Sequence, residues 1–362
     1  MKIKDIGVVL TGNTPKTSDK ENYVSKDICF VKPSDLEEDE INYLSKTEFF
    51  ISNKAKNIAR ILPANSVVVT CIGTIGKVGV TTKECAFNQQ INAIIPNESV
   101  CLSEYLAYLL LSKKTLLNDI ANAPVVPIIN KSQFSEIEIY IPSIQKQSKI
   151  LSTLKKVDDI IYLRKQQLSK FDELVKSRFI ELFGDPITNS NNLPTERMEL
   201  RFNLKAGITT AADDIHEFEK GMYEIPCYGG NGIRGYVREK SYTGNYPIIG
   251  RQGALCGNVQ YATGEFHATE HAVLVSLLKN DNSVWVYHLL KLMDLFRYHT
   301  GAAQPGLAVK TLNTVEVIVA DKRKQDQFAA FVEQADKSKL AIQKSLEQLE
   351  TLKKSLMQQY FE

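Results

Sequence analysis

The second half of this sequence repeats its first half. When Pro127 is aligned with Pro305, an offset of 178 residues, the register holds without a gap to the C-terminus, and Gln147 falls on Gln325. Solenoid repeats have periods of about 20–50 residues. A period this long therefore predicts two copies of a whole domain, which fits a chain of 362 residues at about 100–200 residues per domain.

Upstream of this stretch the repeat continues with small slips in register. The glycine-rich run 73–79 faces the run 250–257, and Phe87 faces Phe266. A chain that carries two similar modules is suited to contact two similar targets at a fixed separation.

The composition is that of an ordinary globular protein, with 43% hydrophobic and 24% charged residues. No run of 18 or more apolar residues occurs, so no membrane span is expected, and the N-terminus has neither an apolar segment nor a cleavage site for export. The six cysteines never approach Cys-x-x-Cys spacing, which excludes a zinc ribbon. We therefore expect reduced, mostly buried thiols and a cytoplasmic location.

The net charge does not reveal the partner. Lys plus Arg number 44 against 42 Asp plus Glu, and no part of the chain is strongly basic. A nucleic-acid partner is therefore not indicated by whole-protein charge. Binding to DNA would require the basic residues to be sorted onto one face.

A long helix is predicted after each module. Residues 144–183 contain neither Gly nor Pro, and apolar residues recur at alternating steps of four and three, which is a heptad seam. Gly184 would cap this helix, with Pro186 just beyond. With about 38 residues at 1.5 Å per residue, each helix would be about 57 Å long. The seam residues are Ile150, Leu154, Val157, Ile161, Leu168, Phe171, Val175 and Leu182 in the first helix, and Phe328, Val332, Ile342, Leu346, Leu349 and Leu356 in the second.

A single apolar stripe on a helix of this length needs a partner. The nearest candidate is the repeat of the same helix, and two-fold pseudosymmetry would make the pair an antiparallel coiled coil. The alternative is that each helix lies along its own domain. The length argues against it, because a 140-residue domain has a radius of gyration of only about 14 Å.

Short β-branched runs bounded by Gly, Asn and Pro predict strands in both modules. The predicted strands are 67–72, 91–95 and 137–141 in the first copy and 246–249, 272–275 and 315–319 in the second, and the predicted helices are 103–112 and 284–297. The fold class is therefore α+β, with two tandem mixed α/β modules. The expected division is 1–143 for the first module, 144–184 for the first long helix, 185–196 for a linker, 197–322 for the second module and 323–362 for the second long helix.

Several local stretches carry a resemblance to a known family. Residues 225–236 read Ile-Pro-Cys-Tyr-Gly-Gly-Asn-Gly-Ile-Arg-Gly-Tyr, residues 249–253 read Ile-Gly-Arg-Gln-Gly, and residues 268–272 read Ala-Thr-Glu-His-Ala. Together with the tandem architecture, they resemble the specificity subunit of Type I restriction-modification systems, over essentially the whole chain. The second copy departs from the pattern at Ala320-Asp321, which stands where the first copy has Pro142.

The resemblance implies that each module is a target-recognition domain that reads one half of a split site in double-stranded DNA. The two helices would set the spacing and dock two modification (methyltransferase) subunits, and two restriction subunits would complete a restriction complex. The chain itself would be non-catalytic and would hold no cofactor. S-adenosylmethionine would bind to the modification subunit.

Residues that can discriminate base pairs gather in the loops expected at the reading face. Arg and Lys match guanine, Asn and Gln match adenine, and neighbouring glycines let backbone N–H groups approach phosphates. The candidate DNA-binding residues are Thr74, Lys77, Asn88, Gln89 and Gln90 in the first copy, and Tyr228, Asn231, Arg234, Arg251, Gln252, Thr269, Glu270, His271 and Gln304 in the second.

Two further motifs are not taken as sites. His267-Ala-Thr-Glu-His271 fits the inverted zinc-protease pattern, but that chemistry needs a helix, whereas Gly264 precedes the motif and a β-branched strand follows it. We therefore predict no metal site. The pair Asp158-Asp159 is expected to be solvated surface.

Two other classes of function remain open. One is a self-contained enzyme, either a DNA methyltransferase of unrecognised type or a zinc hydrolase, although the usual methyltransferase, helicase and nuclease motifs are lacking. The other is a coiled-coil scaffold whose duplicated modules bind protein and not DNA.

Overall fold

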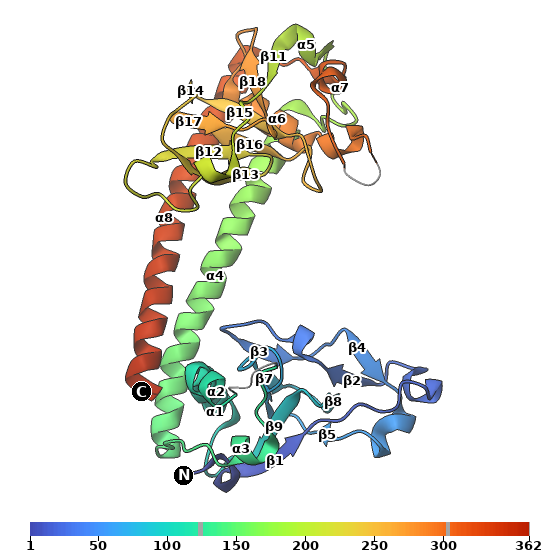
Figure 1. Cartoon of the computed structure of the whole chain (residues 1–362), viewed down its shortest axis with the longest axis vertical. Coiled ribbons are helices and arrows are strands. Elements are labelled where there is room, and N and C mark those ends of the chain that lie inside the picture. The colour runs from blue at the N-terminus through green and yellow to red at the C-terminus, as the bar shows by residue number, and fades with distance from the viewer. Residues whose placement is uncertain (122–125, 302–304, 362) are drawn as a thin grey trace. The chain divides into compact units, whose positions relative to one another are not determined.

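The computed structural model describes residues 1–121, 126–301 and 305–361 (Figure 1). It divides into two compact units: unit 1 contains Met1–Leu163 and Ser345–Glu362, and unit 2 contains Arg164–Lys344. Each unit holds one module and a segment of both long helices. Each compact unit therefore combines segments from both halves of the chain.

Unit 1 is built on two sheets, with strand orders β1-β9-β6-β7-β3 and β4-β2-β8-β5. The strands are β1 Gly7–Thr11, β2 Ile28–Val31, β3 Ile41–Leu44, β4 Phe49–Ile51, β5 Ile61–Leu62, β6 Val67–Thr70, β7 Val78–Thr81, β8 Cys85–Phe87 and β9 Ile91–Pro96. The shorter α-helices are α1 Ser103–Ser112, α2 Lys114–Ile120 and α3 Lys131–Ser135. All four residues of β6 are buried, as its β-branched composition predicts.

Unit 2 repeats this arrangement with sheets β11-β18-β15-β16 and β13-β12-β17-β14, and adds the small sheet β10-β19. The strands are β10 Thr195–Arg197, β11 Phe202–Ala206, β12 Ile225–Gly229, β13 Gly232–Val237, β14 Tyr242–Thr243, β15 Tyr246–Gly250, β16 Val259–Ala262, β17 Glu265–Ala268, β18 Ala272–Leu277 and β19 Glu316–Ile318. The shorter α-helices are α5 Met198–Arg201, α6 Ser283–Leu292 and α7 Val309–Asn313. In both units a parallel strand pair, β2 with β8 and β12 with β17, lies in the second sheet.

The two long helices are α4 (Ile144–Phe183) and α8 (Lys322–Phe361). Gly184 follows α4 with φ 78°, in the left-handed region, and its N–H bonds to the carbonyl of Ile180, so the predicted cap is confirmed.

In each unit α4 and α8 pack side by side (Figure 1). In unit 1, Lys353 of α8 contacts Asp158 of α4 with 2.7 Å between Nζ and Oδ1. In unit 2, the rings of Phe179 and Phe328 meet edge to face with centroids 5.3 Å apart. In unit 1 the N-terminal half of α4 therefore meets the C-terminal half of α8. In unit 2 the C-terminal half of α4 meets the N-terminal half of α8, so the pair is antiparallel.

The helix seam is most deeply buried near the modules. Ile150, Leu154, Val157 and Ile161 in unit 1 are buried, as are Val175, Phe328 and Val332 in unit 2. The other seam residues are half-buried: Leu168, Phe171, Leu182, Ile342, Leu346, Leu349 and Leu356. The heptad reading missed Phe179 and Phe183, which are 0% and 1% exposed and stack around Trp285.

Three local expectations were wrong. The stretch 137–141 is not a strand, and only one bridge, Lys2 with Glu138, forms there. The helix predicted at 284–297 ends at Leu292, because Asp294 takes a left-handed conformation with φ 49° and a 3₁₀ turn follows. Asp158 is not simply solvated, since it accepts a hydrogen bond from the Tyr108 hydroxyl at 2.5 Å and pairs with Lys353.

No helix among the described residues is long and apolar enough to cross a membrane.

Candidate nucleic-acid interface

Four loops of unit 2 converge, and we call them loop cluster 2: residues 207–210, 229–232, 250–257 and 269–271. Backbone hydrogen bonds join them, from Thr269 N to Tyr228 O at 2.9 Å and from Arg251 N to His271 O at 3.0 Å. Two of the loops approach closely at glycines. A Cβ on Gly250 would lie 1.9 Å from the carbonyl oxygen of Gly230, so only glycine fits there.

Unit 1 contains the same construction in loop cluster 1: residues 12–14, 71–77 and 88–90. Asn88 N donates to Val31 O at 3.1 Å and Cys71 N donates to Gln90 O at 2.8 Å, in the same places as the two bonds of unit 2. The matching bonds make three pairs of positions equivalent: Asn88 with Thr269, Gln90 with His271, and Cys71 with Arg251.

The hydrogen-bond pattern also corrects the repeat alignment. Gly12 lies against the carbonyls of Phe87 and Asn88, and Gly207 lies against those of Ala268 and Thr269. Phe87 is therefore equivalent to Ala268 and not to Phe266. A slip of two residues keeps the same face of a strand, so the hydrophobic pattern alone did not reveal the error.

The candidate residues of unit 1 differ in how freely they can reach a ligand. Thr74 and Gln89 are exposed. Lys77 is half-buried and its Nζ donates to Leu36 O at 2.8 Å, so its charge is held within the unit. Asn88 is 5% exposed and its side chain donates to Gln90 Oε1 at 2.8 Å. The freely exposed candidates of loop cluster 1 are therefore two uncharged side chains, Thr74 and Gln89.

The candidate residues of unit 2 lie in or beside loop cluster 2. Asn231, Arg234 and Gln252 are exposed. Tyr228 is half-buried, and its ring meets that of Phe266 edge to face. Gln304 lies outside the described residues.

Glu270 and His271 are held together in loop cluster 2. His271 Nε2 lies 3.2 Å from Glu270 Oε1, while the other oxygen of Glu270 accepts from Thr210 N at 3.3 Å. The acidic side chain of this cluster is therefore engaged by its own neighbours.

Several polar atoms in loop cluster 2 have no hydrogen-bond partner. Within the described part of the chain, five buried side-chain N or O atoms lack one, and three of these lie here: Arg251 Nε, Thr269 Oγ1 and His271 Nδ1. The other two, in Arg164 and Trp285, lie elsewhere. Unsatisfied buried polar groups are rare and costly in folded proteins, so a group of three is unusual.

The histidines of the zinc-like motif do not lie on a helix. His267 is on β17, its Nε2 is 2.8 Å from Thr210 Oγ1, and burial lowers the pKa of its imidazole. No group of three or more His, Cys, Asp or Glu side chains that could hold a metal ion occurs among the residues described. The helix on which a zinc hydrolase of this motif would place its two histidines is therefore not formed at His267.

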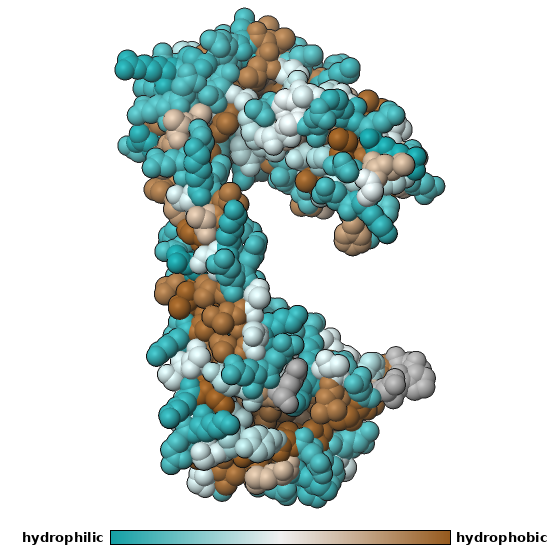
Figure 2. All heavy atoms as spheres, turned by 90° about the vertical axis from the view of Figure 1, so that its left-hand side faces the viewer, coloured by the Kyte–Doolittle hydropathy of each residue, from teal (hydrophilic) through white to brown (hydrophobic). Residues whose placement is uncertain are grey.

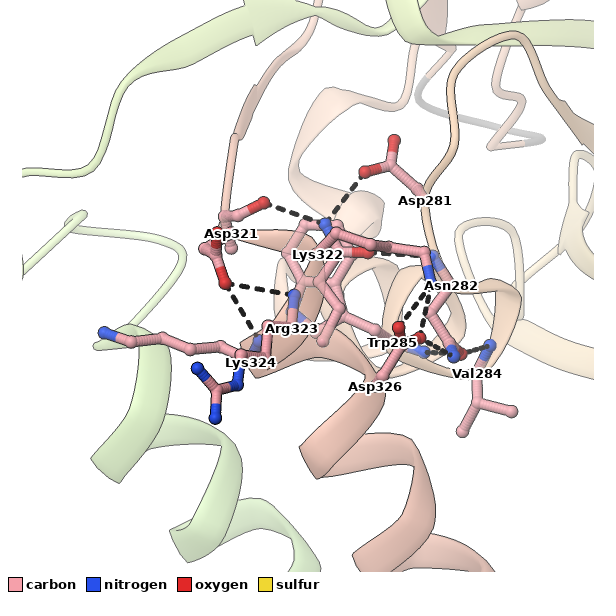
Figure 3. Close-up of polar contacts among 11 residues, drawn as sticks. Asp281, Asn282, Val284, Trp285, Asp321, Lys322, Arg323, Lys324 and Asp326 are labelled. Carbon is pink, nitrogen blue, oxygen red and sulfur yellow. Dashed lines mark hydrogen bonds and ion pairs between the residues drawn. The ribbon is translucent and has the colours of Figure 1, made fainter.

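Sequence reasoning missed the contacts that attach each module to its helix. Figure 3 shows this junction in unit 2, where Asn282 caps α6 and its amide donates to Asp326 of α8 at 2.9 Å. Gln325, which is 1% exposed, accepts from Asn282 N at 2.8 Å. The one available signal was the repetition of this glutamine as Gln147.

A buried ion pair lies beside the same junction. Arg201 Nη2 is 2.6 Å from both oxygens of Asp281, and the two residues are 7% and 8% exposed. The equivalent residues in unit 1 are apolar. Leu278 N bonds to Arg201 O as Asn97 N bonds to Ile6 O, which makes Ile6 the counterpart of Arg201.

Comparisons with known proteins agree with this architecture. Residues 1–171 and 202–353 match the family described as Type I restriction modification DNA specificity domain. The chain is 31% identical over 352 residues to the Type I restriction enzyme EcoprrI specificity subunit of Escherichia coli, covering 90% of this chain and 84% of that protein. It is 28% identical to the MjaIX specificity subunit of Methanocaldococcus jannaschii, covering 98% and 90%.

Solved structures show the same fold. The S subunit of a Type I restriction-modification system from M. genitalium superposes with a TM-score of 0.61 at 16% identity, over 99% of this chain and 94% of that one. A chain from a structure of the type I R-M system gives 0.62 at 13% identity, over 100% and 96%.

The chain belongs to the family of Type I restriction-modification DNA specificity subunits, which are non-catalytic components of their complexes. The family match spans both modules, as the duplicated topology requires.

Proposed function

We propose that the chain gives a Type I complex its DNA sequence preference by reading a bipartite target, with one half read by each unit. The observation that carries this proposal is the pair of equivalent loop clusters. They have the same backbone bonds but different side chains, such as Cys71 opposite Arg251 and Gln90 opposite His271. Because base pairs are distinguished by side-chain donors and acceptors, one scaffold with two sets of side chains suits two different half-sites.

The long helices would set the number of unread base pairs between the halves. α4 and α8 each run for 40 residues without interruption from one unit into the other. Each is about 60 Å long at 1.5 Å per residue. A helix of a given number of residues has a defined length, which favours a spacer of fixed length.

The same helices would dock the modification subunits, which we expect to bind S-adenosylmethionine. Figure 2 shows hydrophobic side chains on the surface of the helices. Exposed apolar side chains of these helices are Ile160 and Leu163 of α4, which are 42% and 56% exposed, and Leu340 and Leu352 of α8, at 58% and 47%. Exposed apolar surface commonly marks a protein interface. Two units of matching construction suit two copies of one partner.

The docking role can be tested by charge insertion. Leu163→Asp places a carboxylate on the apolar surface, and because Leu163 is exposed the fold should tolerate it. We expect at least about a tenfold loss of affinity for the modification subunit, on the order of 1.4 kcal/mol. The matched control is Gln348→Asp at an exposed position of α8. Equal binding by both variants would place the docking surface elsewhere.

The reading role can be tested by selection from a random library of double-stranded DNA. The chain, assembled with its modification subunit, should enrich sequences with two fixed blocks separated by a constant number of unread positions. Assembly without any enriched sequence would favour the scaffold alternative. A single continuous motif would contradict the bipartite reading.

A further inference from the structure

Loop cluster 2 holds an arginine with a fixed backbone whose charge has no partner among the described residues. The backbone of Arg251 is bonded on both sides, from its N–H to His271 O at 3.0 Å and from Leu307 N to its carbonyl at 2.8 Å. Its side chain makes no hydrogen bond or ion pair with any residue in the described ranges, and its Nε is buried. The nearby carboxylate of Glu270 is taken up by His271 and Thr210.

The surroundings of this arginine are also unsatisfied. Thr269 is 0% exposed, and neither its hydroxyl nor Nδ1 of His271 has a partner. These two residues precede β18 in the loop whose carbonyl fixes Arg251. One cation and two further polar atoms therefore lie in two loops of loop cluster 2 that are joined by a backbone hydrogen bond. This combination suits a ligand that offers several acceptors.

Unit 1 lacks this feature at the equivalent position. Cys71 has the same backbone bonds, from its N–H to Gln90 O and from Ile129 N to its carbonyl, both at 2.8 Å. Its side chain is small, uncharged and 2% exposed. The duplicated frame is thus constant, while the charged group is particular to unit 2.

We propose that Arg251 is a specificity-determining residue of unit 2 and that it reads the guanine of one G·C pair in the half-site of that unit. A guanidinium presents paired donors that match the O6 and N7 acceptors of guanine in the major groove. His271, whose side chain is 38% exposed, supplies an adjoining contact, and the half-site of unit 1 has no such requirement at the place of Cys71. This inference rests on the proposed DNA-reading function.

The test compares Arg251→Ala, Arg251→Lys and wild type in the complex with the modification subunit, on the selected target and on targets changed one base pair at a time. We expect Arg251→Ala to lose about 10- to 100-fold of the preference for one G·C pair. All positions of the other half-site should keep their preference. Arg251→Lys keeps the charge but lacks the planar fork, so it should lose the same preference while the salt dependence of binding is retained.

Other outcomes separate this inference from the function on which it rests. Uniform weakening on every sequence, with a salt slope reduced by about one, would make Arg251 a phosphate contact and overturn the proposal. Unchanged preference in both variants would also overturn it. If Arg251→Ala fails to fold, as judged by its melting curve, Arg251→Lys decides. Cys71→Ala is the control in unit 1 and should leave preference at every position intact. A wild-type complex with no sequence preference would instead refute the proposed function.

Discussion

Gln147 and Gln325 make the same contacts in the two units. The side-chain oxygen of Gln147 accepts from Leu102 N at 2.9 Å and that of Gln325 accepts from Asn282 N at 2.8 Å. Each side-chain nitrogen also donates to the carbonyl five residues earlier, Pro142 O and Ala320 O. These buried amides join the start of each long helix to the start of the helix that packs on the module sheet.

Removing either glutamine should weaken its unit. Gln147→Ala and Gln325→Ala each leave buried backbone groups without a partner, so we expect a loss of about 1–3 kcal/mol in the free energy of unfolding. Urea denaturation measures it, with the exposed Gln343→Ala as a control that should change stability by less than about 0.5 kcal/mol. Loss in the control as large as in the variants would refute the role given to the buried amides.

Gln325→Glu should be more damaging than Gln147→Glu. Gln325 Nε2 donates to Asp281 Oδ1 at 2.8 Å, so a carboxylate there would face another buried carboxylate, whereas Gln147 Nε2 donates only to carbonyl oxygens. The same urea titration ranks the two variants. The opposite order would mean that the Arg201 charge outweighs this repulsion.

The Arg201–Asp281 pair should be costly to break but replaceable. Arg201→Ile removes the cation that faces the buried Asp281 carboxylate, and we expect a loss of about 3–5 kcal/mol. Asp281→Cys should cost less, because Arg201 keeps Glu196 at 3.2 Å as a partner. The double variant copies Ile6 and Cys101 of unit 1, which are both 0% exposed, and should recover most of that loss. A double-mutant cycle by chemical denaturation measures the coupling. Additive losses would show that the pair acts as two independent residues.

His288 should make stability depend on pH. Burial, helped by Lys291 and Lys339 and opposed by Asp172, lowers the pKa of His288 to about 4. The unfolded imidazole titrates near 6.5, so the unfolded state takes up a proton first. The neutral His288 therefore contributes fully to the free energy of unfolding above pH 6.5. About 1–3 kcal/mol of this contribution is lost as the pH falls toward 4. His288→Phe should flatten the profile in that window, and an unchanged slope would contradict the assignment.

Helix length should set the length of the unread spacer. Inserting one heptad after Leu163 in α4 and one after Lys344 in α8 keeps the apolar seam and adds about 10.5 Å. At 3.4 Å per base pair, the spacer should lengthen by about three base pairs. The selected DNA motif gives the spacer directly. An unchanged spacer in a complex that still assembles would refute the helices as the ruler.

The sequence predicted the features that repeat. The glycine-rich loops and the heptad seams recur at an offset of 178 residues, so two modules and two long helices could be predicted from the pattern alone. Contacts that differ between the copies left no such trace. Arg201 and Asp281 lie 80 residues apart and replace apolar residues of unit 1, so nothing local in the sequence joins them.

The candidate site was predictable in composition but not in geometry. The loops around Asn88 and Thr269 were identified from their residue types, yet which of those side chains are tied up internally depends on partners distant in sequence. Lys77, for example, is held by Leu36 O. Residue types likewise do not show that, among the described residues, the buried Nε of Arg251 has no partner.

The most direct test of the central claim is methylation mapping of the genome in cells that express this chain with its modification subunit, beside cells that express that subunit alone. We predict a split methylated motif that appears only with this chain. Exchange of residues 1–143 for those of a relative should change one half of that motif and leave the other half and the spacer intact. Assembly of the complex without a new motif, or a change in both halves after the exchange, would contradict it.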